Sequence, residues 1–336
     1  MSTRSDPLRS SSITDSELLP VERMALAIGR LDGRVSATSL APAWMLRARW
    51  TGYARALQLM GAEIDPIDVF SWGCGLPLPD RAARRTHADD YAAFAPWQAR
   101  LAERARHWAE GLPFSPPDED GRARKPVVER AIDLLGLWLA RAPGIEAWLA
   151  LPILLHRLGM TQAPLPCLVA GDRRLVHAPG DRAARRRLID ELAGQADASL
   201  AALDGLERSR AVALDAIAAE HRPGALSRLL PLMLAAPVQT PEGVARQLDL
   251  TLSGAGKLLD RAARLGFAAE ISGRRSWRVY ATRDVAIQLG LVDVPRGRPP
   301  ALRPREEPVS EVVAAFDREM ADLARRFPGL LDEAGD

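Results

Sequence analysis

One stretch, residues 239–283, constrains what this chain can fold into more than any other. It opens with Thr240, Pro241 and Glu242, which supply a capping hydroxyl, a proline at the first helical position and an acid in the first turn of a helix. A turn at residues 249–251 follows, and after it come a second helix and two strands. This order of elements predicts a winged helix-turn-helix, a module that typically holds duplex DNA.

The second helix of this stretch has an apolar side and a small, polar side. Apolar residues recur at intervals of three and four and are predicted to face the core: Leu252, Ala255, Leu258, Leu259, Ala262 and Leu265. The other side offers Thr251, Ser253, Gly254 and Lys257. The small, polar side chains let a helix approach base edges, and Lys257 is available for phosphate or guanine, so these four are the predicted DNA-recognition residues.

The two predicted strands, residues 267–272 and 276–281, enclose a basic tip. Arg274 and Arg275 lie at this tip with Arg278 nearby, which suits a wing that runs along the phosphate backbone. Residues 240–283 hold eight Arg or Lys against four Asp or Glu, whereas the whole chain has a net charge of only +2. Positive charge is therefore concentrated where a DNA-binding module needs it.

A second basic feature lies at residues 295–299, which read Pro-Arg-Gly-Arg-Pro. This segment resembles the core of the AT-hook, a short extended motif that lies in the minor groove of A·T-rich DNA. The resemblance implies that Arg296 and Arg298 run along that groove. An Arg/Pro-rich linker accounts for the same five residues equally well, and both interpretations stay open.

The chain as a whole is predicted to be mainly α-helical, with a helical N-terminal domain and the winged helix-turn-helix, including its small β-hairpin wing, near the C-terminus. We assign the parts by residue number: 1–14 as a disordered tail, 15–222 as a helical domain of unknown function, 223–292 as the winged module, 293–308 as a linker and 309–330 as an amphipathic helix. Seven of the eight tryptophans precede residue 150, so we expect them in the core of the helical domain.

Finer elements of these parts also follow from the pattern. A first helix is predicted to end at Asp32-Gly33, residues 65–87 are predicted as an irregular loop, and residues 182–194 and 196–220 as two helices of a hairpin. The C-terminal helix carries one apolar stripe, made of Val309, Val312, Val313, Phe316, Met320, Leu323 and Phe327. This stripe must pack on the chain's own body or on a second subunit, and the second option would make the protein a homodimer.

Two family resemblances bear on these predictions. Residues 265–285, LGFAAEISGRRSWRVYATRDV, resemble the C-terminal winged helix of many Fic-type proteins. The catalytic signature of that family, a His-Pro-Phe loop followed by Gly-Asn-Gly-Arg, has no counterpart here, so the resemblance does not imply adenylylation. The chain, including RLDGRV at residues 30–35 and FSWGCG at residues 70–75, is also similar to a bacterial, often plasmid-borne family that joins a domain of unknown function to a helix-turn-helix domain. That similarity implies DNA binding and supplies no catalytic residues.

Groups that could support catalysis are few. Cys74 and His87 would be a thiol and a base, but the glycines adjacent to Cys74 do not match a nucleophile elbow, and a buried structural cysteine fits better. Asp65 and Asp68 fit loop capping better than an acid pair. The five histidines show no metal-ligand spacing, and the sequence has no P-loop or GxGxxG. We therefore expect no enzyme activity, no metal and no other cofactor.

Three features of the sequence indicate where in the cell we expect the protein. The chain has no run of eighteen apolar residues, its N-terminus has no apolar core of a signal peptide, and its two cysteines lie far apart. We expect a cytoplasmic transcriptional regulator or a DNA-binding protein of a plasmid or other mobile element, with double-stranded DNA as its partner and no membrane. The alternatives are a protein-interaction module, such as a toxin–antitoxin partner or a scaffold, and an enzyme housed in the N-terminal domain.

Overall fold

A computed structural model describes residues 15–64, 66–73, 91–103, 109–114, 125–273, 278–288 and 290–293, together with residues 314, 316, 318, 321 and 322. In these ranges the protein is mainly α-helical with one small three-stranded antiparallel sheet, which confirms the predicted fold class at this level. Within the same ranges no helix has the length and apolar character that a membrane crossing requires.

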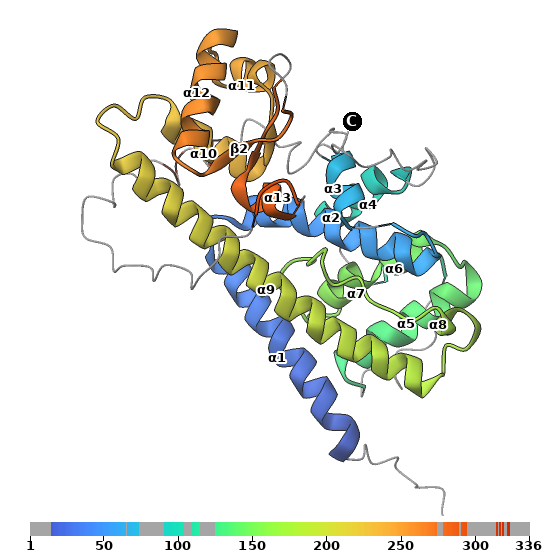
Figure 1. The fold of residues 1–336 in the computed structure, drawn as a ribbon. Coiled ribbons are helices and arrows are strands. Elements are labelled where there is room, and N and C mark those ends of the chain that lie inside the picture. The colour runs from blue at the N-terminus through green and yellow to red at the C-terminus, as the bar shows by residue number, and fades with distance from the viewer. Residues whose placement is uncertain are drawn as a thin grey trace, which may run out of the picture.

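Two long helices, α1 (Asp15–Ala37) and α9 (Arg182–Ala218), pack against each other along one side of the molecule (Figure 1). Met24, Ile28 and Leu31 recur on α1 at spacings of three and four, and all three side chains are fully buried. The long pair spans from the helical body to the segment that holds the sheet, so α9 belongs to both parts (Figure 1).

Two predicted helix ends are wrong. α1 continues through Asp32, because the Asp32 carboxylate accepts the backbone N–H of Gln162 at 3.1 Å instead of capping a turn of its own. Residues 182–218 form one 37-residue helix rather than a hairpin. A glycine such as Gly194 costs a helix only about 1 kcal/mol, and the buried side chains of Leu192 and Ala196 on either side of it outweigh that cost.

The central helix of the body is α2 (Ala41–Met60). The described residues of the body contain six further helices: α3 (Pro66–Gly73), α4 (Phe94–Ala102), α5 (Val127–Arg141), α6 (Ile145–Leu149), α7 (Leu151–Arg157) and α8 (Arg174–His177). The predicted irregular loop at residues 65–87 is wrong over α3, where Phe70 packs edge-on against Trp50 with ring centroids 4.5 Å apart. Burial of this apolar face stabilises the helix locally.

The tryptophan prediction holds for most of the described tryptophans. Five are buried: Trp44, Trp50, Trp97, Trp138 and Trp148. Two of them also satisfy their indole N–H with a backbone carbonyl, as buried tryptophans normally do. Trp72 differs, because it is 41% exposed and stacks on Tyr91 with ring centroids 4.1 Å apart.

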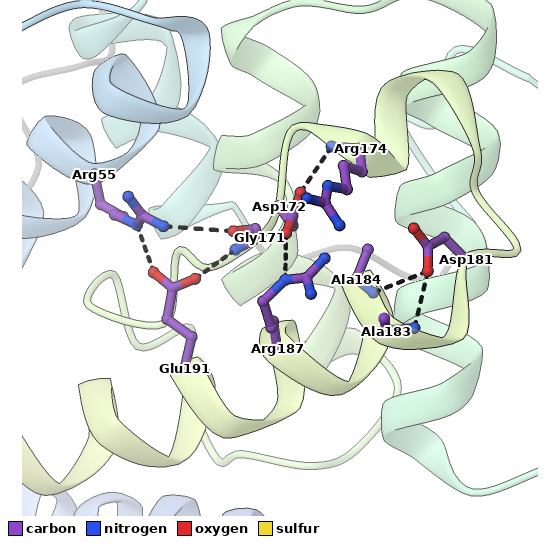
Figure 2. Close-up of polar contacts among 9 residues, drawn as sticks. All are labelled: Arg55, Gly171, Asp172, Arg174, Asp181, Ala183, Ala184, Arg187 and Glu191. Atoms are coloured by element: carbon purple, nitrogen blue, oxygen red, sulfur yellow. Dashed lines mark hydrogen bonds and ion pairs between the residues drawn. The ribbon is translucent and has the colours of Figure 1, made fainter.

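A polar network holds the N-terminal half of α9 against α2 (Figure 2). Glu191 of α9 accepts Nε of Arg55 at 2.5 Å and the backbone N–H of Gly171 at 3.0 Å. Arg55 also donates to the Gly171 carbonyl at 3.4 Å, so three segments of the chain meet at one carboxylate.

Asp181 caps α9 by accepting the N–H groups of residues 183 and 184. The backbone N–H of residue 174 and the guanidinium of residue 187 both bind Asp172, and they hold its pKa below the usual value against the opposing effect of burial.

The sheet and its helices lie at the C-terminal end of α9 (Figure 1). In chain order these elements are α10 (Leu226–Ala235), β1 (Val238–Gln239), α11 (Pro241–Leu248), α12 (Leu252–Arg264), β2 (Ala268–Glu270), β3 (Tyr280–Thr282) and α13 (Arg283–Gln288). The strand order is β1-β3-β2. α10 contacts α2 and α9, and α13 contacts α9, which anchors this unit on the body.

Candidate nucleic-acid interface

The two helices of the predicted module form as the capping pattern indicates. Thr240 adopts an extended backbone before α11, and its hydroxyl accepts the N–H of Gly243 at 3.1 Å. Asp249 ends α11 in a left-handed conformation with φ 54°, which turns the chain sharply. Thr251 then caps α12 by accepting the N–H of Gly254 at 3.1 Å. The turn between the helices is therefore only three residues long, and a side-chain cap fixes the start of each helix.

The buried face of this pair follows the predicted spacing with one exception. Six side chains are buried: Val244, Leu248, Ala255, Leu258, Leu259 and Ala262. Leu265 is half-buried. The prediction that Leu252 faces the core is wrong, because 54% of this residue is exposed. It occupies the first position of α12, where a helix has no preceding turn to continue its buried stripe.

The outer face of α12 presents the predicted recognition residues at its N-terminal end. Thr251, Ser253 and Lys257 are exposed, and Gly254 is half-buried between them. A side chain added at Gly254 would bring a Cβ within 3.0 Å of the capping hydroxyl of Thr251. The glycine therefore avoids this close contact and leaves no side chain on the surface at this end of the helix.

Behind these helices the sheet has one strand more than predicted, and its strands are shorter. The sequence indicated a two-stranded hairpin with strands at residues 267–272 and 276–281, whereas β2 and β3 cover three residues each and β1 adds a third strand. Val238 of β1 pairs with Ala281 of β3, and Ala269 of β2 pairs with the same residue from the other side. β1 was missed because a strand of two residues has no period to detect.

The hairpin leads to the predicted basic tip. Gly273 has φ +60°, a conformation that favours glycine, and Arg274 and Arg275 lie outside the described residues. Arg278 has an intramolecular partner: its Nη1 and Nη2 donate to the two oxygens of Asp260 at 2.6 and 3.1 Å. Its guanidinium lies 5.6 Å from the ring centroid of Tyr280. Arg278 thus ties the segment before β3 to α12, a role that the sequence did not indicate.

The Asp260 carboxylate is the centre of this cluster. It also accepts the hydroxyl of fully buried Tyr280 at 2.6 Å, so one side chain of α12 holds two residues of the hairpin. Burial acts to raise the pKa of Asp260, but hydrogen bonds from Tyr280 and Arg278 outweigh burial and hold the pKa below its usual value. The same burial and the carboxylate raise the pKa of Tyr280. The cluster joins α12 to β3 and to the residue two positions before it.

This lowered pKa leads to a prediction on stability. Because the folded-state pKa of Asp260 is depressed, its stabilisation is present above the unfolded carboxyl pKa of about 3.9 and is lost as the pH falls through the lower folded value. Asp260→Asn is expected to lower the free energy of unfolding at neutral pH by about 1 kcal/mol, since the side chain is 35% exposed and solvent screens the pair. Urea denaturation of both proteins should show the difference shrinking below about pH 4.

A matched control exists on α9. Asp197 pairs with Arg30 of α1 at 2.9 Å, and both side chains are more than half exposed. Asp197→Asn should change the free energy of unfolding little at either pH. A gap between wild type and Asp260→Asn that stays constant from neutral to acid pH would contradict the assigned role of Asp260.

The other predicted site residues fall into two groups. Arg296, Arg298, Cys74, His87 and Asp65 lie outside the described residues. Asp68 lies in the first turn of α3.

Cys167 is buried, and burial raises the pKa of its thiol to about 12, which removes thiolate reactivity there. The described residues contain no group of three or more His, Cys, Asp or Glu side chains placed to hold a metal ion.

The C-terminal stripe is described at one apolar position, Phe316. Its side chain is 2% exposed and belongs to the main core, and the Arg210 guanidinium of α9 lies 4.1 Å from its ring centroid. At this position the stripe packs on the chain's own body. The remaining apolar residues of the stripe lie outside the described residues, so a homodimer stays a prediction.

Comparison with known proteins adds no relative. No protein-family model matches the chain, and no curated protein matches it either. The functional argument therefore depends on the residues themselves.

Proposed function

We propose that residues 226–288 form a winged helix-turn-helix that binds double-stranded DNA, and that the protein is a cytoplasmic transcriptional regulator or mobile-element DNA-binding protein. One observation carries the proposal: α12 exposes its N-terminal end, with small side chains and Lys257, on a helix pair in which each helix start is capped. A helix with this surface fits the major groove, where base edges are read.

Each predicted residue has a task in this proposal. Thr251, Ser253 and Gly254 approach the bases, and Lys257 contacts guanine or phosphate. Exposed Leu252 adds an apolar side chain suited to the methyl group of thymine. Arg274 and Arg275 contact phosphates from the wing, while Arg278 holds the wing at the correct angle through Asp260. Arg296 and Arg298 would add a grip in the minor groove.

Salt dependence tests the proposal. Binding to random and to A·T-rich duplexes is measured over a range of salt concentrations for wild type, Arg274→Ala/Arg275→Ala and Arg296→Ala/Arg298→Ala. We expect wild-type affinity to fall with salt, and the first double variant to reduce the slope of log affinity against log salt by about 2. The second should lose affinity selectively for the A·T-rich duplex.

The control is Arg23→Ala/Arg30→Ala, which removes two exposed arginines of α1 and the same charge. Its slope should equal that of wild type. If wild type binds neither duplex at low salt, the DNA-binding proposal fails, and the exposed end of α12 with Leu252 is then tested as a surface for a protein partner.

A further inference from the structure

A cavity of about 740 Å³ separates the helical body from the unit that carries α12. α2, α3 and α9 form one side of it, and α10, β3 and α13 form the other. Much of its wall is apolar, with six large side chains among the lining residues: Trp44, Ile67, Phe70, Leu206, Leu230 and Phe267. The volume lies within the range of small-molecule sites, and position between two units is a common place for such a site.

One part of the cavity wall is polar. Arg47 of α2 donates through Nη1 to the carboxylate of Asp284 in α13, and the two side chains are only 15% and 24% exposed. Nε and Nη2 of Arg47, Oδ1 of Asp284 and Oγ1 of neighbouring Thr282 are buried with no hydrogen-bond partner among the described residues. Buried polar groups normally have partners, and each group left without one costs about 1–3 kcal/mol. This part of the wall therefore lacks hydrogen-bond partners that a bound molecule would supply.

The charges of the lining residues indicate which kind of molecule would supply the missing hydrogen-bond partners. The residues that line the cavity include three arginines, Arg47, Arg208 and Arg283, and one acid, Asp284. Arg208 and Arg283 are exposed, and neither makes an ion pair with a residue that the structure describes. The cavity thus combines an apolar interior with an excess of positive charge, which favours an apolar molecule that carries one anionic group. A guanidinium binds a carboxylate through two parallel hydrogen bonds.

We propose that this cavity binds an amphipathic carboxylate, whose carboxyl group pairs with Arg47 in exchange for Asp284 and whose apolar body lies among the six large side chains. The exchange gives Nε and Nη2 of Arg47 an acceptor. The step is non-covalent and needs no co-reactant.

Binding at this position acts on the link between the two units. Arg47 belongs to the body, whereas Asp284 lies two residues after the end of β3, the central strand of the sheet behind α12. Release of Asp284 removes a short tether between α2 and α13 and changes how the body holds the sheet. The ligand therefore alters DNA affinity, and this second statement rests on the proposed function.

Calorimetry tests the site independently of DNA. The probes are naphthaleneacetate and its neutral isostere naphthaleneacetamide. Wild type should bind the acid at least about 10-fold more tightly than the amide, because only the acid pairs with Arg47. Arg47→Met/Asp284→Asn replaces the pair by neutral side chains and leaves no unpaired charge, so it should fold and lose most of the preference for the acid, with Arg208 and Arg283 keeping only a small remainder. Ser209→Trp, which adds bulk to the cavity wall, should abolish binding of both probes.

The control is Arg30→Met/Asp197→Asn, an exposed pair between α1 and α9 that should retain the preference of wild type. Equal affinity of wild type for acid and amide, absence of binding to either, or a preference that survives undiminished in Arg47→Met/Asp284→Asn would overturn the site. DNA affinity is then measured with and without naphthaleneacetate, and it should change in wild type and not in that double variant. Acid-selective binding without any DNA binding would refute the proposed function and leave the ligand site standing.

Discussion

Replacing Gly52 by alanine is expected to destabilise the protein by about 3 kcal/mol or more, the upper end of what overpacking costs. Gly52 is buried in α2, and a Cβ built on it would lie 2.0 Å from the carbonyl oxygen of Pro166 and 3.2 Å from the ring of Trp97. The first contact is with backbone, which cannot rotate away as a side chain can. Urea denaturation followed by tryptophan fluorescence measures the change in free energy of unfolding.

The matched control is Gly29→Ala in α1. Gly29 is exposed in mid-helix, and no atom lies within 4 Å of a Cβ built there. Alanine should therefore stabilise this helix by about 0.5–1 kcal/mol, because it loses less backbone entropy on folding. Two identical substitutions should thus have opposite signs. A Gly52→Ala protein as stable as wild type would show that α2 and the segment around Pro166 are not packed as described.

The variant Ser253→Glu/Lys257→Glu introduces two carboxylates and removes one ammonium group. It is expected to weaken DNA binding by roughly 100-fold at about 100 mM salt. Both residues are exposed, so the fold and the free energy of unfolding should change little. The two carboxylates would face phosphates in the bound state, and one cationic contact would be lost at the same time. Fluorescence anisotropy with a labelled duplex gives the dissociation constants.

A second variant separates the local effect from net charge. Arg23→Glu/Ala25→Glu on α1 alters the charge of the protein by the same amount at exposed positions. Its affinity for DNA should fall far less. If both variants weaken binding equally, DNA contacts the protein through diffuse charge and not through α12, and the recognition assignment is wrong.

The parts of the fold that could be predicted from sequence are those fixed by local chemistry. Thr240 and Thr251 indicate helix starts because a cap needs only residues three positions away, and the buried stripe of α12 follows from helical periodicity. β1 and the Arg47–Asp284 pair could not be predicted. β1 exists only through pairing with β3 some forty residues later, and the ion pair joins residues 237 positions apart.

Predictions failed where long-range packing outweighed local preference. The sequence around Gly194 favours a break, yet the helix continues because its apolar face has α1 to pack against. Leu252 fits the apolar period and is nonetheless exposed, since periodicity does not show where a neighbouring element ends. The same limit applies to the candidate site. The outer face of α12 could be predicted from the sequence, whereas the bond between Arg278 and α12 depends on a partner in another element.

The pairing of α1 with α9 also determines when the protein can fold during its synthesis. α1 leaves the ribosome before α9, and the helix that covers Met24, Ile28 and Leu31 is not complete until residue 218. At translation rates of about 5–20 residues per second, the apolar face of α1 waits roughly 10–40 s for its partner. Throughout that interval the nascent chain exposes a ready-made surface for a chaperone, and contacts of such long sequence separation form late in folding.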